Sequence, residues 1–502
     1  MPSPPPFVLP LGPHTSLSVE TLERAAHSDA LRVRPTEAAT EGLRRARSAL
    51  DTIRESGGSV YGLTTGFGPL HEYASDDADT PAHGEGLLAH LATGSGDLLA
   101  PALVRAMMGV RLQSLAQGHS AVTPSTFEAL AALLEADVVP AVPEIGSLGA
   151  SGDLTPLAHV ARVCTGEGRV LADGEPVAAG PALDDAGLEP VALGARDALA
   201  LVNGTAFMTG TAALALARGR RLVERAEALT GWAYRVLGCS LEALDPRLHE
   251  ARGHAGQAAS ADAIRREATR HGPAERPERP LQEVYSLRCA PQILGAARDQ
   301  LGYVRDVVET ELNGVTDNPI TDPAAPAALH GGNFQGQQVA FAADALNEAL
   351  TQVGVLVERQ IDVLLSPDQN EATPLLAWTP GPTSGLAGAQ LTATALVAEL
   401  RQNAQMAGTS SIPTNDDNQD VVSMGALAAR TAHDQTERLA PILAVMGLAL
   451  SQLTHLQEAD RAEGPAPPPP PWMPAIDPVV EDRPLRGEID TLAARWLAPT
   501  DD

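Results

Sequence analysis

Three consecutive small residues, Ala150, Ser151 and Gly152, have the chemistry to build an electrophile from the backbone itself. They lie in a stretch, 146–159, that reads Gly-Ser-Leu-Gly-Ala-Ser-Gly-Asp-Leu-Thr-Pro-Leu-Ala-His. In a tight turn the nitrogen of Gly152 can reach the carbonyl carbon of Ala150, because glycine leaves that nitrogen unhindered. Cyclisation and loss of the Ser151 hydroxyl as water would then give a 4-methylidene-imidazol-5-one, a conjugated electrophile.

The composition removes the usual alternative source of an electrophile for amino-acid chemistry. All 35 basic residues are arginines, and the chain has no lysine. A pyridoxal-phosphate enzyme needs a lysine for its Schiff base, and a phosphate-binding P-loop also needs one, so both are excluded. The three cysteines are too few and too scattered for a disulfide framework or a zinc site, and no metal is expected.

Several further motifs stand in an order that resembles the aromatic amino acid ammonia-lyase family, which includes histidine, phenylalanine and tyrosine ammonia-lyases and the related aminomutases. The family's tyrosine-bearing loop is matched by Val-Tyr-Gly-Leu-Thr-Thr-Gly-Phe-Gly at 60–68, and its electrophile-forming segment by 149–157. Its Asn-Gly-Thr segment is matched at 203–205, its carboxylate-binding segment at 285–292, and a further pair at 316–319 and 331–334. So many ordered motifs make coincidence very improbable.

The resemblance implies catalytic roles at the matched positions. The electrophile would form autocatalytically and would need neither metal nor pyridoxal phosphate. Tyr61 would remove the weakly acidic β-proton, while the substrate amine, once added to the electrophile, would become a leaving group. Asn203 and Tyr285 would hydrogen-bond the electrophile and the substrate head group. The catalytic set is then Tyr61, Ala150, Ser151, Gly152, Asn203, Tyr285 and Arg288.

Two of these residues make physical demands on the site. Tyr61 can accept a proton only if its pKa, ordinarily about 10, is depressed, so little negative charge is expected around it. Arg288 offers a planar fork that holds a carboxylate more specifically than a point charge does. Because the chain has no lysine, an arginine must meet the substrate carboxylate.

Two positions bear on the choice of amino acid. His90 and Leu91 fall where the family's selectivity pair lies, and a His-Leu pair is similar to that of the bacterial tyrosine ammonia-lyases. An imidazole can pair with a buried para-hydroxyl, and a phenylalanine ring would leave that imidazole unsatisfied. Gln419 stands where histidine lyases carry a glutamate, so histidine is disfavoured as substrate. The substrate-binding set is Gly68, His90, Leu91, Leu154, Arg288, Phe334, Asn418 and Gln419, of which Asn418 and Gln419 could instead be polar packing.

The predicted function is the non-oxidative deamination of L-tyrosine to para-coumarate and ammonia. The alternatives are a tyrosine 2,3-aminomutase, which returns the ammonia to Cβ and gives β-tyrosine, and a phenylalanine ammonia-lyase. The loop 68–86 is the candidate lid that would decide how long the product and the trapped amine stay together. An inactive scaffold or binding protein of the same fold is a different possibility, which the retention of Ser151, Tyr61 and Arg288 disfavours.

Some positions depart from the family's pattern. Glu283 replaces the more common aspartate two residues before Tyr285, and Thr64 stands where asparagine is frequent. Glu283 should be tolerated, because it keeps the carboxylate and adds one methylene. Asp416 and Asp417 add negative charge near the expected site without an evident reason.

Long helices must position these residues. Apolar residues recur at three and four positions in 333–365, 384–406 and 424–460, and shorter helices are predicted at 18–27, 35–54 and 485–497. The stretches 66–86 and 146–152 lack periodicity and are predicted to be loops. The expected fold is mainly α, a large bundle of long central helices with a smaller, loop-rich N-terminal portion that carries the active site. The expected domains are 1–195 with the electrophile-forming loop, 196–460 with the bundle, and 461–502 with a Pro-rich spacer and a terminal helix.

Charge limits the partners. The net charge of −28 disfavours nucleic acid and anionic membrane surfaces, which reward clustered positive charge. The N-terminus lacks the features of a signal peptide, and no uninterrupted apolar stretch reaches membrane-spanning length, so a cytoplasmic protein is expected. The expected ligand is a small aromatic amino acid, and the resemblance implies a homotetramer whose sites are shared between subunits.

Overall fold

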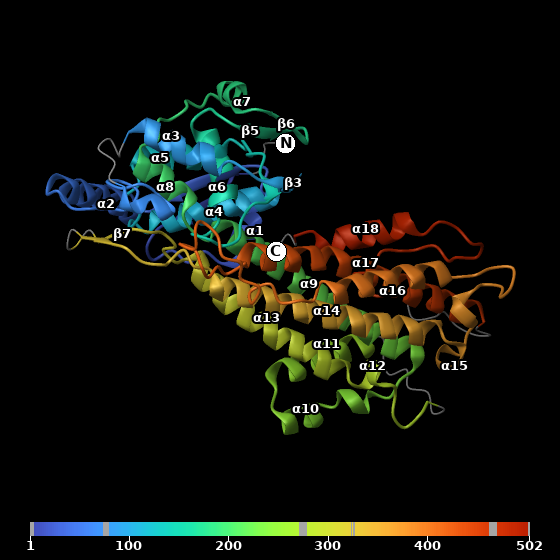
Figure 1. Cartoon of the computed structure of the whole chain (residues 1–502). Helices are drawn as coiled ribbons and strands as arrows, with labels where there is room; N and C mark the ends of the chain where they lie inside the picture. Colours follow the sequence, from blue (N-terminus) through green and yellow to red (C-terminus); the bar gives the residue numbers. More distant parts are fainter. Residues whose placement is uncertain are drawn as a thin grey trace. The chain divides into compact units, whose positions relative to one another are not determined.

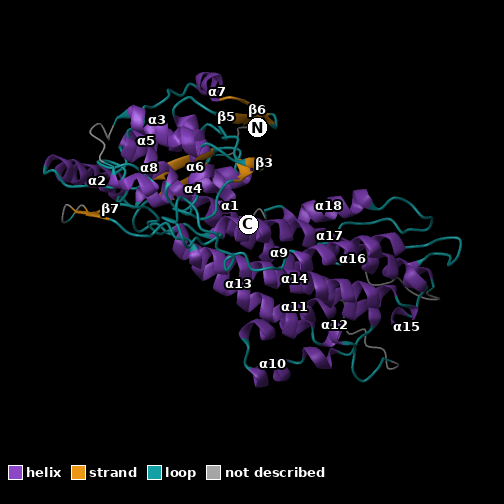
Figure 2. Cartoon of the chain, viewed as in Figure 1, coloured by secondary structure: helices purple, strands orange, loops and turns teal. Residues whose placement is uncertain are grey.

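The computed structural model describes residues 5–73, 80–270, 279–322, 324, 327–460 and 469–499. In this part of the chain helices predominate and the few strands are short (Figure 1, Figure 2), which confirms the mainly α fold expected from the sequence. The chain forms two compact units. Unit 1 comprises Met1–Ala217, Arg305–Asp344 and Met406–Arg430, and unit 2 comprises Arg218–Val304, Ala345–Gln405 and Thr431–Asp502.

Unit 1 contains helices of at most 19 residues, the ends of some longer ones, and all the strands of the described chain. Its helices are α1 (Val19–His27), α2 (Glu37–Glu55), α3 (Pro81–Leu91), α4 (Pro101–Ala116), α5 (Pro124–Glu135), α6 (Leu154–Cys164), α7 (Ala179–Ala186) and α8 (Ala195–Val202), with a short 3₁₀ turn, η1 (Gly68–Glu72). Threonine caps such as Thr36 and Thr80 accept a backbone N–H at the start of α2 and α3, and Pro81 follows at the first turn of α3. Helices α4 and α8 are almost wholly buried and form the centre of this unit.

The strands of unit 1 pair only two by two. Strands β1 (Phe7–Leu11) and β2 (Leu31–Pro35) are parallel. The other pairs are antiparallel: β3 (Ser95–Leu98) with β4 (Pro143–Ile145), β5 (Arg169–Ala172) with β6 (Glu175–Ala178), and β7 (Ile320–Asp322) with β8 (Ala327–Leu329). Each pair is too small to form a core, so the strands serve to fasten loops between helices.

Unit 2 is a bundle of long helices that lie side by side (Figure 1). Its elements come from α9 (Ala206–Leu237), η2 (Leu241–Leu244), α10 (Pro246–Arg252), α11 (Ala255–Ala268), α12 (Tyr285–Arg288), α13 (Ala290–Leu312), α14 (Gln337–Leu365), α15 (Pro367–Asn370), η3 (Pro374–Leu376), α16 (Ala387–Gln402), α17 (Gly425–Ala459) and α18 (Arg486–Leu497). The buried Gln435 of α17 donates from Nε2 to Asn347 Oδ1 of α14 at 2.8 Å and to the Leu400 carbonyl of α16 at 2.9 Å. Three of the long helices are therefore tied together by one side chain.

Helix α17 is long and apolar enough to cross a membrane by length and composition alone, with a mean hydropathy of 1.6. However, 83% of the apolar window is buried inside the protein. Packing within the helix bundle therefore accounts for its apolar character.

The helices predicted from periodicity are confirmed with small shifts at their ends, as α1, α2, α14, α16, α17 and α18. The expected loop 66–86 is only partly right, because η1 and the start of α3 lie within it, and its residues 74–79 lie outside the described residues. The two compact units do not coincide with the three consecutive domains expected, since 305–344 and 406–430 return to unit 1. The Pro-rich spacer also lies largely outside the described residues.

Candidate active site

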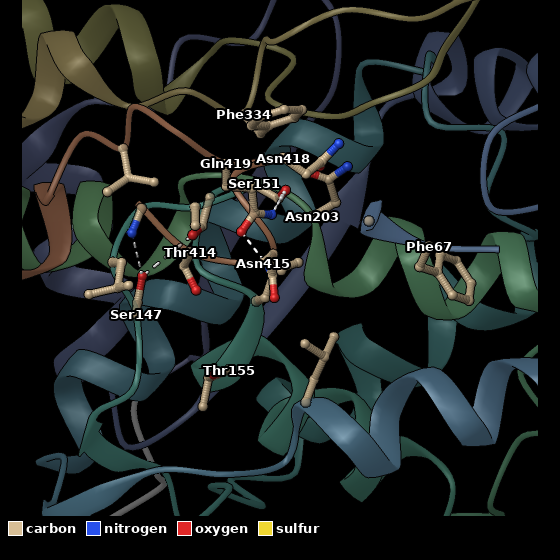
Figure 3. A pocket seen from close by; sticks show the side chains of 18 of the residues that line it. Phe67, Ser147, Ser151, Thr155, Asn203, Phe334, Thr414, Asn415, Asn418 and Gln419 are labelled. Atoms are coloured by element: carbon tan, nitrogen blue, oxygen red, sulfur yellow. Dashed lines mark hydrogen bonds between the residues drawn. The ribbon is translucent and has the colours of Figure 1, made fainter. Parts of the chain in front are cut away.

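Unit 1 contains a cavity of about 820 Å³. The residues that line it come from the loop after α2, from α3, from the loop before α6, from the end of α8, and from 318–335 and 414–422, all of which belong to unit 1. Among them are Tyr61, Gly68, His90, Leu91, Ala150, Ser151, Gly152, Leu154, Asn203, Phe334, Asn418 and Gln419. Segments far apart in the sequence thus bring most of the predicted site residues to one cavity (Figure 3).

The Ala-Ser-Gly segment forms a tight turn at the wall of this cavity. Gly149 and Gly152 face each other as an antiparallel bridge, and Ser151 between them has φ +55°, a conformation that costs a non-glycine residue about 1–2 kcal/mol. Gly152 has φ +78° and packs against Gly204 so closely that a Cβ would lie 2.2 Å from the Gly204 carbonyl oxygen. Only glycine fits there, so the turn is tightly packed at the nitrogen that the predicted cyclisation would use.

The polar side chains of Ser147 and Asp153 stabilise this turn through hydrogen bonds. Ser147 Oγ donates to Asp153 Oδ1 at 2.7 Å and accepts from the Gly149 amide at 3.1 Å. Asp153 Oδ2 accepts from the Met208 amide at 2.9 Å, and the Asp153 amide donates to the Gly204 carbonyl at 2.8 Å. Burial raises the pKa of Asp153 to about 7, in spite of these hydrogen bonds to its carboxylate. The sequence segment contained Ser147 and Asp153, but nothing in it distinguished them from loop residues.

Gln419 fixes the direction of the Ser151 hydroxyl. Its Nε2 donates to Ser151 Oγ at 2.9 Å, while its Oε1 accepts from Asn415 Nδ2 at 2.6 Å (Figure 3). Because Asn415 occupies the oxygen of the amide, Gln419 presents its nitrogen to Ser151. Asn415 was not among the predicted site residues.

The backbone around Asn415 explains the two acidic residues that the sequence left without a reason. Thr414 and Gln419 exchange backbone hydrogen bonds of 3.1 and 3.3 Å, and the turn between them has φ values of +54°, +55° and +57° at Asn415, Asp416 and Asp417. Asparagine and aspartate are the non-glycine residues that tolerate this left-handed conformation best. Asp416 and Asp417 are therefore turn residues that hold Gln419 in place.

Asn203 follows directly after α8 and is almost fully buried. Its Nδ2 donates to the Asn318 carbonyl at 2.8 Å, whereas its Oδ1 is buried and has no hydrogen-bond partner within the described chain. The 316–319 turn that supplies this carbonyl is anchored by the buried Asp317, which pairs with Arg196 and lies 3.5 Å from Arg111 Nη2. Asn203 therefore keeps an unused acceptor beside the Ala-Ser-Gly turn.

Tyr61 is held between two buried neighbours, Val60 and Leu63, which belong to an apolar cluster with α2. Its hydroxyl accepts a hydrogen bond of 2.7 Å from the Gly68 amide, which lowers its pKa, but burial outweighs this bond and raises the pKa above the ordinary value. The prediction of a depressed pKa is therefore wrong for the single chain. The phenol lies in a low-dielectric wall, and a single backbone N–H does not compensate for the lost hydration.

His90 faces the cavity from the last turn of α3, with Leu91 beside it. Its Nδ1 lies 3.0 Å from the Gly86 carbonyl, and a carbonyl only accepts, so this nitrogen carries the proton. In this tautomer Nε2 is the nitrogen left to accept a hydrogen bond, which is the group that a substrate hydroxyl needs.

Tyr285 and Arg288 are the two predicted residues that do not line this cavity. Both belong to α12 in unit 2, where the Arg288 guanidinium lies 4.6 Å from the centre of the Tyr285 ring. Tyr285 is 70% exposed, and Arg288 Nε is buried without a hydrogen-bond partner in the described part of the chain.

A mainly α-helical chain whose cavity holds a strained Ala-Ser-Gly turn, a tyrosine and a histidine has the groups of a carbon–nitrogen lyase. Residues 17–468 match the family model for aromatic amino acid lyases. A tyrosine ammonia-lyase of Cupriavidus metallidurans is 43% identical over 444 residues, which cover 84% of this chain and 83% of that relative. The chain therefore belongs to the aromatic amino acid lyase family, and it is a carbon–nitrogen lyase.

A second relative is named as an aminomutase instead of an ammonia-lyase. The MIO-dependent tyrosine 2,3-aminomutase of Streptomyces globisporus is 40% identical, over 88% of this chain and 86% of that protein. The crystal structure of the tyrosine aminomutase from Streptomyces globisporus superimposes with a TM-score of 0.88 at 36% identity, covering 97% of both chains. Similarity thus extends to lyases and aminomutases alike.

Proposed function

We propose that this protein deaminates L-tyrosine to para-coumarate and ammonia with a 4-methylidene-imidazol-5-one made from Ala150, Ser151 and Gly152. The observation that carries the proposal is the strained turn at Ser151, which faces the same cavity as Tyr61 and His90. The relatives named tyrosine ammonia-lyase support the same substrate class.

The residues present fit the formation of this group. The Gly152 nitrogen would bond to the Ala150 carbonyl carbon, whose oxygen leaves as one water, and Ser151 would lose its Cα proton and its hydroxyl as a second water. The Gly149–Gly152 bridge brings the ends of the turn together, and Gln419 donates to the departing Ser151 oxygen. The group supplies an electrophile for the substrate amine.

The surrounding side chains suit tyrosine as substrate. Tyr61 is within the cavity wall as the acceptor of the β-proton, and His90 Nε2 offers an acceptor for the para-hydroxyl. Leu91, Leu154 and Phe334 provide apolar contacts for the ring. Arg288 and Tyr285 would bind the carboxylate and the head group, and we propose that another subunit of a homotetramer supplies them, because the described residues that line the cavity all belong to unit 1.

The first test is a substrate panel with the purified protein. Tyrosine, phenylalanine and histidine are incubated separately, and products are followed by absorbance and, for β-amino acids, by chromatography. Para-coumarate from tyrosine is the expected main product. No product from any of the three would rule out both the lyase and the mutase, and would leave an inactive scaffold or binding protein.

The second test concerns the electrophile itself. The intact mass of the wild-type protein is expected to fall below the sequence mass by two waters, and its spectrum should contain the absorbance of the conjugated ring. Ser151→Ala lacks the leaving hydroxyl, so it should keep the second water, lose the absorbance and lose nearly all turnover. A wild-type mass equal to the sequence mass would contradict the proposed cofactor.

A tyrosine 2,3-aminomutase is the second candidate, and the similarity to the Streptomyces globisporus enzyme favours it. The two reactions differ in whether the ammonia escapes before it can add to Cβ, so β-tyrosine in the product mixture distinguishes them. A cytoplasmic location is part of the same proposal, and the net charge of −28 supports the absence of nucleic-acid and anionic-membrane partners.

A further inference from the structure

Helix α12 is a single turn, yet it carries both Tyr285 and Arg288. A helix of four residues is not stable by itself, because one turn gains too few hydrogen bonds to offset the ordering of its backbone. Its buried residue is Leu287, whereas Tyr285 is largely exposed. The backbone of α12 is supported by α13, which begins at Ala290 directly after it, and by the side chains that hold its carbonyls and its entry, so these contacts set the direction of the two side chains.

Buried side chains hold two carbonyls of this turn. Gln360 of α14 donates from Nε2 to the Ser286 carbonyl at 2.8 Å, and its own Oε1 accepts from Thr230 Oγ1 at 3.1 Å. The Tyr234 hydroxyl of α9 donates to the Leu287 carbonyl at 3.1 Å. The turn is thus fastened to two long helices of unit 2.

The segment that enters α12 is fastened by an ion pair. Arg279 donates from Nε to Glu283 Oε1 at 2.9 Å and from Nη2 to the other carboxylate oxygen, and the two side chains are only 6% and 5% exposed. Arg279 Nη1 also donates to the Gln369 carbonyl of α15 at 2.6 Å, and Nη2 contacts Cys239 Sγ at 3.9 Å. Arg279 therefore connects Glu283, at the entry of α12, to α15 and to the residues after α9.

A buried ion pair adds little net stability, because the desolvation of two charges offsets their attraction. It does fix geometry, since a bidentate pair allows few arrangements. We propose that Arg279 and Glu283 are positioning residues that set the place of Arg288 and Tyr285 for the substrate carboxylate. The proposal rests on the carboxylate-binding role of Arg288 in the proposed function.

The test is Glu283→Gln, which keeps the shape of the side chain but removes the charge. Displacement of Arg288 weakens the carboxylate contact in the bound substrate and in the transition state alike, so KM should rise while kcat changes little. We expect KM for tyrosine to rise roughly tenfold and kcat to stay within about threefold. Glu283→Asp, which restores the carboxylate, should recover most of the affinity. The dissociation constant of para-coumarate, measured by equilibrium dialysis, should rise in parallel with KM.

A double variant and a matched control complete the experiment. Arg279→Gln combined with Glu283→Gln leaves no unpaired buried charge, so it remains informative if the single variant does not fold. Its KM should be no higher than that of Glu283→Gln, because the two residues act through each other. The control is Glu227→Gln, which breaks the pair between Glu227 Oε1 and Arg298 Nε, 2.5 Å apart, in the same unit. It should leave KM unchanged.

The proposal would be overturned by a wild-type KM and dissociation constant in Glu283→Gln or in the double variant. An equal rise in Glu227→Gln would also overturn it, because the effect would then be a general loosening of unit 2. Failure of the wild type to release product from any of the three amino acids would instead contradict the proposed function. In that case the dissociation constants for para-coumarate still test whether the ion pair positions Arg288 and Tyr285.

Discussion

Tyr61 lines the cavity where the proposed base is needed, but its pKa is raised instead of depressed. Its hydroxyl lies in the cavity wall and accepts from the Gly68 amide, but burial raises its pKa. A base whose pKa is above neutrality exists mostly in its protonated form, so only a small fraction of the protein has a phenolate at neutral pH. Positive charge supplied by Arg288 of a second subunit would oppose this effect.

The pH dependence of turnover follows from this shift. Because the base form of Tyr61 increases as pH rises towards its pKa, kcat/KM for tyrosine is expected to increase from neutral to alkaline pH, by up to about tenfold per pH unit. Tyr61→Phe should lower turnover by roughly 10²–10⁴-fold and flatten this rise. The amine of the substrate titrates in both proteins, so the difference between the two profiles isolates Tyr61. Identical slopes would mean that another group is the base.

His90 makes a prediction about selectivity. Its Nε2 would accept a hydrogen bond from the substrate hydroxyl, and a bound phenylalanine ring would cover that nitrogen without offering it a partner. His90→Phe is expected to shift the ratio of kcat/KM for phenylalanine over tyrosine by roughly 10–100-fold towards phenylalanine. The ratio is measured with both substrates under the same conditions.

His71 provides the matched control for this experiment. It lines the same cavity, and its Nδ1 lies 3.0 Å from the Gly68 carbonyl, so it resembles His90 in its local bonding. His71→Phe should leave the ratio of the two substrates unchanged. If His71→Phe shifted it as strongly as His90→Phe, the selectivity would come from the bulk of the cavity and not from the hydroxyl contact.

At the residue scale the sequence motifs predicted most of the cavity wall, since their order implied known chemistry. They did not predict Asn415, whose role depends on a left-handed turn that brings its amide to Gln419. They also could not predict the raised pKa of Tyr61, because burial is a property of the packed structure. The motifs grouped Tyr285 and Arg288 with the cavity residues, but both belong to α12 of unit 2 and do not line the cavity, which a motif cannot reveal.

At the scale of elements, α6 begins directly beneath the Ala-Ser-Gly turn with a buried carboxyl group. Asp153 immediately precedes Leu154, the first residue of the helix, and receives hydrogen bonds from Ser147 and from the Met208 amide of α9. The same burial that holds the turn rigid raises the pKa of Asp153 to about 7, from an ordinary value of 3.8. The free energy of unfolding therefore depends on pH through the carboxyl group at the start of this helix.

The direction in which stability changes with pH depends on whether the folded or the unfolded chain binds more protons. Between pH 4 and 7, in round numbers, the folded chain holds a proton on Asp153 that the unfolded chain has released, so stability falls as pH rises through this window and levels off above it. Asp153→Asn removes the titration. Relative to the wild type it should gain stability from pH 5 to pH 8, by roughly 4 kcal/mol at most. Urea unfolding of both proteins at several pH values measures this, and parallel curves would contradict it.

Periodicity predicted the long helices well because their apolar stripes are unambiguous over many turns. It failed where helices are short or glycine-rich, as at the start of α3, where Thr80 and Pro81 begin a helix inside an expected loop. It also gave no reason to divide the chain between two interleaved units. The return of 305–344 and 406–430 to unit 1 depends on long-range packing, to which local patterns are blind.

At the scale of the whole molecule, the predicted site residues are divided between the cavity of unit 1 and helix α12 of unit 2. Every described residue that lines the cavity belongs to unit 1, while Tyr285 is 70% exposed. Other large apolar side chains are also exposed, including Leu391, Val421 and Ile412. Single exposed apolar side chains are common on protein surfaces and do not by themselves indicate a subunit contact. The proposed homotetramer would bring α12 of one chain to the cavity of another.

Complementation between two inactive variants tests this arrangement. Tyr61→Phe damages the cavity of unit 1, and Tyr285→Phe damages α12 of unit 2, so each variant alone should have little activity. If every site takes Tyr61 from one chain and Tyr285 from another, random co-assembly of equal amounts gives about a quarter of the sites both intact residues. Co-expressed, differently tagged chains purified through both tags should then recover up to about a quarter of wild-type turnover. If both residues served the same site from one chain, no mixed oligomer would contain an intact site, and activity would stay at the level of the single variants.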